Sequence, residues 1–131
     1  MDLDYKKSII SYYDATRLDY RILWFGRRNR SVHFGYYDNE VKTHHDALLN
    51  LNKIMALKVG VKDGDIILDA GCGQGGSSVW LAENYNVTVS GITLVPHQVK
   101  KAAKNAAKNK VSRKVSFSEQ DYTSTHFENE S

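Results

Sequence analysis

The stretch that decides the fold is Ile67-Leu68-Asp69-Ala70-Gly71-Cys72-Gly73-Gln74-Gly75-Gly76. An apolar run ends in an aspartate, and four glycines follow within six residues. The polar turn KDGD opens the run, so residues 65–70 are predicted to form a short buried strand. Glycines let the backbone approach a ligand, and a helix N-terminus attracts negative charge. The stretch therefore predicts a strand, a tight turn and a helix that together hold a ligand.

The residues after this stretch predict an α/β fold. We expect a helix over 77–84, a strand over 86–92, a helix that begins near Pro96, and a third strand over 114–121. The order β-α-β-α-β favours a parallel sheet with right-handed crossovers. In a doubly wound fold the first strand is central, so its free edge must be covered. We expect this chain to be a fragment of a longer protein, or to form a homo-oligomer through that edge.

The first 60 residues differ in composition from the rest, because they are rich in aromatic and charged residues. They are predicted to form an N-terminal helical cap over 1–60, followed by the α/β region over 61–131. One predicted helix face carries Tyr5, Ile9, Tyr12, Tyr13, Thr16, Tyr20, Leu23 and Trp24. Residues 33–40 are predicted to be a loop, and a second helix is expected over about 41–58. Its apolar stripe is Ala47, Leu48, Leu51, Ile54, Met55 and Leu57.

Composition excludes several classes of protein. A chain of 131 residues forms at most one ordinary domain, and a net charge of +3 is no evidence for nucleic-acid binding. A single cysteine, Cys72, forms no internal disulfide and fits a reducing compartment. No signal peptide or transmembrane segment is predicted, which favours a cytoplasmic protein. The five histidines and the cysteine have no metal-ligand spacing, so no metal site is expected.

Two cofactor classes fit the glycine loop. Gly71, Gly73 and Gly76 satisfy G-x-G-x-x-G, the dinucleotide pattern. That pattern also needs an acid about 20 residues on, at the end of the second strand, to hold the ribose. The chain has Gly-Ile-Thr-Leu at 91–94 instead, with no acid. The alternative is D-x-G-x-G-x-G, which begins at Asp69 and is shared with class I methyltransferases; their cofactor, S-adenosylmethionine, has a cationic amino end that Asp69 would face.

The longer stretch ILDAGCGQGGSSVWLAENYNVTVSGITLVPHQVKKA, from Ile67, resembles methyltransferases of the cyclopropane-fatty-acid synthase, sterol and tocopherol type. Members of this group carry a GxTLSxxQ block where the acid is missing, and residues 91–98 match it except for Val95 in place of serine. SYYDATRLDYRILW and SVHFGYYDNE resemble the helical cap of the lipid-modifying members. The resemblance implies the first half of a Rossmann-like class I methyltransferase fold, with three parallel strands preceded by the cap.

The resemblance also implies a set of cofactor-binding residues. Thr93, Leu94 and Gln98 would line the ribose and adenine side, and Asp121 would be the adenine-side acid, followed by Tyr122. Tyr13 and the region from His33 to Tyr36 would close over the methionine end, where aromatic faces suit a sulfonium cation. The full predicted set is Asp69, Gly71, Cys72, Gly73, Gly75, Thr93, Leu94, Gln98, Asp121, Tyr122, Tyr13, His33 and Tyr36. Asp121 fits a turn cap equally, and Cys72 fits as a small residue in a tight loop.

The functional hypothesis is S-adenosylmethionine-dependent methyl transfer to a small or lipid-like acceptor. No residue is predicted to be a catalytic base, because in this family such groups usually follow the fourth strand. We therefore expect the fragment to bind cofactor weakly and to turn over no substrate alone. Two alternatives stay open: an NAD(P)-dependent oxidoreductase fragment and a non-catalytic binding or assembly module.

Overall fold

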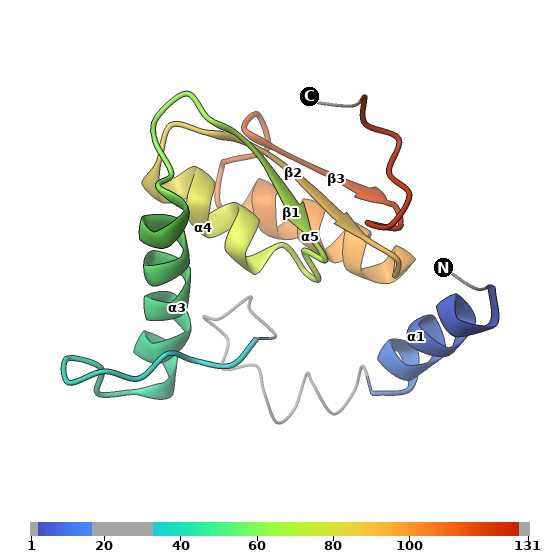
Figure 1. The fold of residues 1–131 in the computed structure, drawn as a ribbon, viewed down its shortest axis with the longest axis horizontal. Coiled ribbons are helices and arrows are strands. Elements are labelled where there is room, and N and C mark those ends of the chain that lie inside the picture. The colour runs from blue at the N-terminus through green and yellow to red at the C-terminus, as the bar shows by residue number, and fades with distance from the viewer. Residues whose placement is uncertain (1–2, 17–32, 129–131) are drawn as a thin grey trace.

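The computed structural model describes residues 3–16 and 33–128. Three helices and three strands follow the loop at 33–43: α3 (His44–Val59), β1 (Ile66–Ala70), α4 (Gly76–Asn84), β2 (Thr88–Thr93), α5 (Pro96–Lys108) and β3 (Val115–Glu119). They are preceded by α1 (Leu3–Ala15) (Figure 1). The predicted α/β fold is confirmed, and each predicted strand is present with bounds that differ by at most two residues. Tyr20, Leu23 and Trp24 of the predicted helix face lie outside the described residues.

The sheet is parallel throughout, with the order β1-β2-β3. Ile66 of β1 lies opposite Thr88 of β2, and Val89 of β2 lies opposite Val115 of β3. Helices α4 and α5 are the two crossovers and cover the same face of the sheet, behind the strands in Figure 1. On β1, Ile66 and Leu68 point to the opposite face and are 82% and 48% exposed. The described part of the chain therefore forms a sheet with one face covered by helices.

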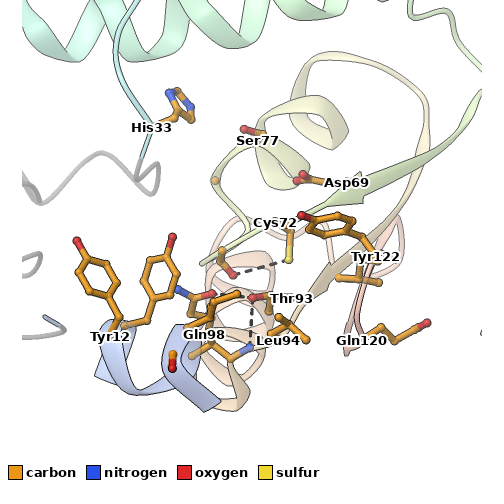
Figure 2. A pocket seen from close by; sticks show the side chains of 18 of the residues that line it. Tyr12, His33, Asp69, Cys72, Ser77, Thr93, Leu94, Gln98, Gln120 and Tyr122 are labelled. Carbon is orange, nitrogen blue, oxygen red and sulfur yellow. Dashed lines mark hydrogen bonds between the residues drawn. The ribbon is translucent and has the colours of Figure 1, made fainter. Parts of the chain in front are cut away.

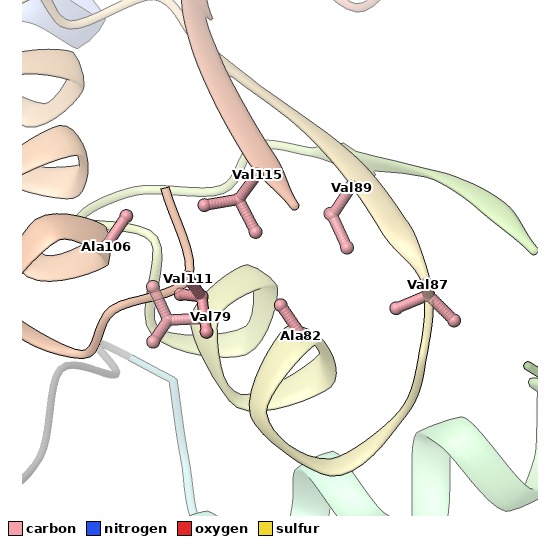
Figure 3. Close-up of a cluster of buried hydrophobic side chains, with 7 residues drawn as sticks. All are labelled: Val79, Ala82, Val87, Val89, Ala106, Val111 and Val115. Carbon is pink, nitrogen blue, oxygen red and sulfur yellow. The ribbon is translucent and has the colours of Figure 1, made fainter. Parts of the chain in front are cut away.

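The core lies between the sheet and these two crossover helices. Figure 3 shows its buried side chains, contributed by α4, α5, β2 and β3 and the segments that precede the strands: Val79, Ala82, Val87, Val89, Ala106, Val111 and Val115. Most of these residues are β-branched or small, which suits strands in contact with closely approaching helices. This core packs β2 and β3 on the two crossover helices, and Ile67 of β1 is partly buried against it.

Helix α3 begins and ends at clear caps. The Thr43 hydroxyl accepts a hydrogen bond from the Asp46 backbone N–H and donates one to the Asp46 carboxylate. At the other end, Gly60 adopts a left-handed conformation with φ of 76°, and its N–H donates to Ala56 and Leu57 carbonyls. The predicted boundary between the cap and the α/β region falls at this glycine. The division into two domains stays a prediction.

The buried face of α3 differs from the predicted stripe. Ala47, Leu48, Asn52 and Ala56 are buried, whereas Met55 and Leu57 are 56% and 61% exposed. The stripe was expected to be apolar, but the helix packs on α4 through a polar residue. Asn52 Oδ1 accepts a hydrogen bond of 2.9 Å from the Ser77 hydroxyl at the start of α4. A buried polar side chain is tolerated because it is hydrogen-bonded.

Candidate functional site

The glycine loop connects β1 to α4 in three tight steps. Gly71, Gly73 and Gly75 have φ angles of 90°, 53° and 76°, a region that favours glycine. The backbone N–H groups of Gly71 and Cys72 both donate to the Ile92 carbonyl of β2 at 2.9 Å. These hydrogen bonds hold the loop against the carboxyl end of the neighbouring strand. The predicted order of strand, turn and helix is confirmed.

The glycines of the loop meet different surroundings. A Cβ at Gly71 would have no heavy atom within 4 Å, so this position faces open space. A Cβ at Gly75 would lie 2.8 Å from the Phe117 ring and 2.9 Å from Ala102 Cβ. Gly91 of β2 also abuts Phe117, at 2.6 Å. Gly75 and Gly91 thus make room for an aromatic side chain of β3, while Gly71 leaves space for a ligand.

A pocket of about 660 Å³ opens at the carboxyl ends of the strands, beside this loop (Figure 2). This volume is in the range of small-molecule sites. The pocket is lined by Tyr5, Ser8, Ile9, Tyr12, Tyr13, His33, Asp69, Gly71, Cys72, Gly73, Gly76, Ser77, Ile92, Thr93, Leu94, Val95, Gln98, Gln120 and Tyr122. Ten of the thirteen predicted site residues are in this set, and Gly75, Asp121 and Tyr36 are not. Residues from five separate segments of the chain meet in one cavity.

Asp69 is the acidic side chain of the pocket lining. The Ser78 hydroxyl of α4 donates to its Oδ2 at 2.5 Å. Burial raises the pKa of the Asp69 carboxyl above its usual value, while hydrogen bonds from Ser78 and the charge of His33 oppose this rise. A partly desolvated carboxylate of this kind gains from a cationic partner. Asp69 therefore gives its end of the pocket a preference for positive charge.

Cys72 packs inside the loop and is not poised as a nucleophile. Its side chain is buried, and burial together with the neighbouring Asp69 raises the pKa of the thiol to about 12. A thiol with this pKa stays protonated at neutral pH, so it behaves as a small apolar group. This agrees with the interpretation of Cys72 as a small residue that fits a tight loop.

The end of β2 supplies a buried polar pair in place of an acid. The Thr93 hydroxyl donates to Gln98 Oε1 at 2.7 Å, and it accepts a hydrogen bond from the Val95 N–H at 3.3 Å. Both side chains are buried and both line the pocket, as does Leu94 beside them. A dinucleotide site would carry its ribose-binding acid at the end of β2, and here that place is taken by Thr93, which is hydrogen-bonded to Gln98 of α5.

Asp121 lies just outside the pocket, between two residues that line it, Gln120 and Tyr122. Its Oδ1 accepts hydrogen bonds from the Thr123 N–H at 2.8 Å and hydroxyl at 2.7 Å, so it caps a turn. Its Oδ2 forms an ion pair of 2.8 Å with Lys6 Nζ of α1. Lys6 first, then the Thr123 hydrogen bonds, lower the pKa of the Asp121 carboxyl. A contact of Asp121 with cofactor stays a prediction.

The two predicted cap residues of the loop at 33–40, His33 and Tyr36, have different positions. His33 lines the pocket, its Nδ1 lies 2.8 Å from the Phe34 carbonyl, and its buried Nε2 has no hydrogen-bond partner among the described residues. Tyr36 lies outside the lining and is 47% exposed. The Tyr36 backbone N–H donates to the Ala47 carbonyl of α3 at 2.9 Å, which fastens the segment to that helix. His33 is therefore the part of this segment that a pocket ligand would meet.

Several lining residues were not predicted as site residues. Tyr5, Ser8, Ile9 and Tyr12 come from α1, whereas Ser77, Val95 and Gln120 lie within two residues of predicted positions. The periodic aromatic face of α1 was the available signal, but packing of a helix on the core produces the same pattern. Within the described ranges, no three metal-ligating side chains come together, and no helix has both the length and the apolar content to cross a membrane.

Comparison with known proteins identifies the group to which this fold is related. Residues 4–130 match the family model for mycolic acid cyclopropane synthetase. The chain is 29% identical to the chloroplastic tocopherol O-methyltransferase of Arabidopsis thaliana over 136 aligned positions, covering 95% of this chain and 38% of that protein. It is 35% identical to the 27-O-demethylrifamycin SV methyltransferase of Amycolatopsis mediterranei over 72 residues, covering 55% of this chain and 26% of that protein.

Solved structures show the same fold. The crystal structure of the [4+2]-cyclase SpnF superposes with a TM-score of 0.84 at 26% identity, covering 93% of this chain and 44% of that one. The chain thus spans less than half the length of each of these proteins. The predicted resemblance and the Rossmann-like fold class are confirmed.

Proposed function

This chain belongs to the mycolic acid cyclopropane synthetase family, a family of S-adenosylmethionine-dependent methyltransferases, and from that premise we propose that its pocket binds S-adenosylmethionine. The observation that carries the proposal is the pocket lining, which brings ten of the thirteen residues predicted from the sequence into one cavity. A dinucleotide is less well supported, because the end of β2 carries the Thr93–Gln98 pair and no acid.

Each part of the pocket has a proposed role in holding the cofactor. Asp69, partly desolvated and acidic, would face the cationic amino group of the methionine end. The backbone at Gly71 and Gly73 would approach the ligand closely, since a Cβ at Gly71 would stand in open space. Thr93, Leu94 and Gln98 would line the ribose and adenine side. These residues bind and orient the cofactor, and none of them is assigned a catalytic role.

The remaining predicted residues would complete the enclosure. Tyr13 and His33 line the pocket and would lie near the methionine end, and Tyr122 would lie on the adenine side with Asp121 behind it. Gly75 would act indirectly by shaping the loop, and Tyr36 would act only if the loop at 33–40 moved toward the ligand. When bound, S-adenosylmethionine supplies an electrophilic methyl group. The chain's own contribution is to exclude water and to hold that group in place.

The methyl acceptor is proposed to be a small or lipid-like molecule. Support comes from the family and from relatives whose names specify tocopherol and rifamycin substrates. The SpnF structure shows that the same fold also serves a cyclase, so cofactor binding and methyl transfer need separate tests. We propose that residues 1–131 bind cofactor and turn over no acceptor by themselves. A homo-oligomer through the β1 edge stays a prediction.

The test is calorimetric titration of the purified chain with S-adenosylhomocysteine, with NADH as the second ligand. We expect saturable binding of S-adenosylhomocysteine and none of NADH. Asp69→Asn should weaken the binding about tenfold, since it removes the charge beside the amino group. Asp63→Asn, in the exposed turn before β1, is the matched control and should bind as the wild type does. Binding of NADH, or of neither ligand, would overturn the cofactor assignment. Methylation of an acceptor by this chain alone would overturn the proposed inactivity.

A further inference from the structure

Helix α1 lies beside the pocket mouth and contributes one of its walls. Tyr5, Ser8, Ile9, Tyr12 and Tyr13 line the cavity, and Figure 2 shows Tyr12 on this helix. These positions recur at steps of three and four, so they share one face of the helix. The wall that α1 provides is therefore in place only while this face is held against the ends of the strands.

Little apolar burial holds α1 there. All of its residues are described, and none of them is buried. Leu3, Tyr5 and Tyr12 are 70%, 60% and 55% exposed. Stabilisation by the hydrophobic effect scales with the apolar area removed from water. The position of α1 against the strand ends must therefore depend on polar contacts more than the positions of α4 and α5 do.

Two ion pairs join α1 to the segments that border the pocket. Lys6 Nζ lies 2.8 Å from Asp121 Oδ2, between the lining residues Gln120 and Tyr122. Asp14 Oδ1 lies 2.8 Å from Nδ1 of His97, which directly precedes the lining residue Gln98. Positions 6 and 14 lie two turns apart on the helix, about 12 Å. One ion pair thus stands near each end of the pocket-lining face of α1.

The two ion pairs differ in their exposure to water. The Asp121 side chain is only 6% exposed and that of Lys6 is 34% exposed, so this pair is partly shielded from solvent. The low pKa of Asp121 keeps its carboxylate charged across the neutral range. The side chains of Asp14 and His97 are 57% and 23% exposed, and the strength of this pair requires a protonated imidazole. Exposed pairs are weak and screened by salt, so Lys6 is the main anchor.

We propose that Lys6 is a positioning residue, assisted by the Asp14–His97 pair. It holds α1 in place as one wall of the pocket and so sets how long a ligand stays bound. Because α1 forms one wall of the pocket, a ligand leaves faster when the helix is released, and ionic strength weakens the contacts that hold it. This seating of α1 is a property of the ligand-free chain. Its effect on ligand residence rests on the proposed function.

Hydrogen exchange measured by mass spectrometry on the ligand-free chain tests the seating directly. Lys6→Gln should speed exchange in residues 3–15 up to about fivefold, while exchange in β2 stays unchanged. Lys7→Gln is the matched control, because Lys7 pairs within α1 with Asp4 at 3.9 Å and, among the described residues, forms no ion pair with a pocket segment. Lys6→Arg should restore slow exchange. Raising NaCl from 0.05 to 0.5 M should speed exchange of α1 in the wild type more than in Lys6→Gln.

The dissociation rate of S-adenosylhomocysteine then tests whether the position of α1 affects how long the ligand stays bound. We expect Lys6→Gln to raise this rate several-fold, with Lys7→Gln and Lys6→Arg near the wild type. Equal exchange of α1 in Lys6→Gln and Lys7→Gln would overturn the proposal, and so would an unchanged dissociation rate in Lys6→Gln. If the exchange results hold while no variant binds S-adenosylhomocysteine, the seating stands and the cofactor assignment fails.

Discussion

Two features favour glycine at position 75: its left-handed backbone and its close contact with Phe117 and Ala102. The cost of Gly75→Ala in free energy of unfolding can be worked out from both. The left-handed conformation of Gly75, with φ of 76°, costs an L-residue about 1–2 kcal/mol. The added Cβ would also lie 2.8 Å from the Phe117 ring and 2.9 Å from Ala102 Cβ. Overpacking of this kind costs about 1–3 kcal/mol, so the free energy of unfolding should fall by about 2–5 kcal/mol.

Gly64→Ala supplies the matched control for this prediction. Gly64 has φ of 92°, but a Cβ there would meet no atom within 4 Å, so only the conformational cost of about 1–2 kcal/mol applies. Urea unfolding at 25 °C, followed by circular dichroism, gives the free energies, and the slope m should be the same for both variants. In a Phe117→Leu background the cost of Gly75→Ala should fall toward that of Gly64→Ala. Equal costs for the two variants in the wild-type background would refute the packing argument.

Three further predictions concern the pocket. Because burial raises the pKa of Cys72 to about 12, iodoacetamide at pH 8 should label the native thiol at least about a hundredfold more slowly than free cysteine; fast labelling without urea would contradict this. Because burial raises the pKa of Asp69, affinity for S-adenosylhomocysteine should decline as pH falls through that raised pKa, at a higher pH than for an exposed aspartate. Asp69→Asn should abolish this decline in calorimetric titrations, and a decline that persists in the variant would assign it to another group. Thr93→Val leaves the buried Gln98 carbonyl without its donor and should cost about 1–3 kcal/mol in urea unfolding, whereas Thr93→Ser should cost less; equal losses would show that the hydrogen bond is not responsible.

The α/β region could be predicted from sequence because local signals and packing agree there. The run before Asp69 is apolar and ends at glycines, and the stretch before Thr93 is β-branched, so both strands follow from the pattern alone. Parallel strands place their carboxyl ends at one edge of a sheet, which is why residues after β1 and β2 meet in the pocket. The resemblance of residues 91–98 to the GxTLSxxQ block of the family identified Thr93 and Gln98 as the polar side chains at the end of β2.

The helical half was less predictable because its packing depends on partners far along the chain. Met55 and Leu57 were expected in the buried stripe of α3, yet Asn52 occupies the contact because Ser77 of α4 offers it a hydrogen bond. The Lys6–Asp121 ion pair joins residues more than a hundred positions apart, and no spacing rule links them. Asp121 was predicted as a ligand contact or a turn cap; the cap is present, and the sequence held no sign of its second partner.

The register of the sheet also sets the order in which this chain can acquire structure. Ile66 pairs with Thr88, and Val89 pairs with Val115, so each pairing must close a loop of more than twenty residues that includes a whole helix. Such non-local contacts slow folding, since the entropy of loop closure is lost before the pairing stabilises the chain. Strand β2 takes part in both pairings, so within the part of the chain that the structure describes neither neighbour has a strand partner until β2 is present. During synthesis, β1 can therefore pair with β2 only after residues 88–93 have emerged from the ribosome. Until then the N–H groups of Gly71 and Cys72 in the glycine loop lack their acceptor, the Ile92 carbonyl.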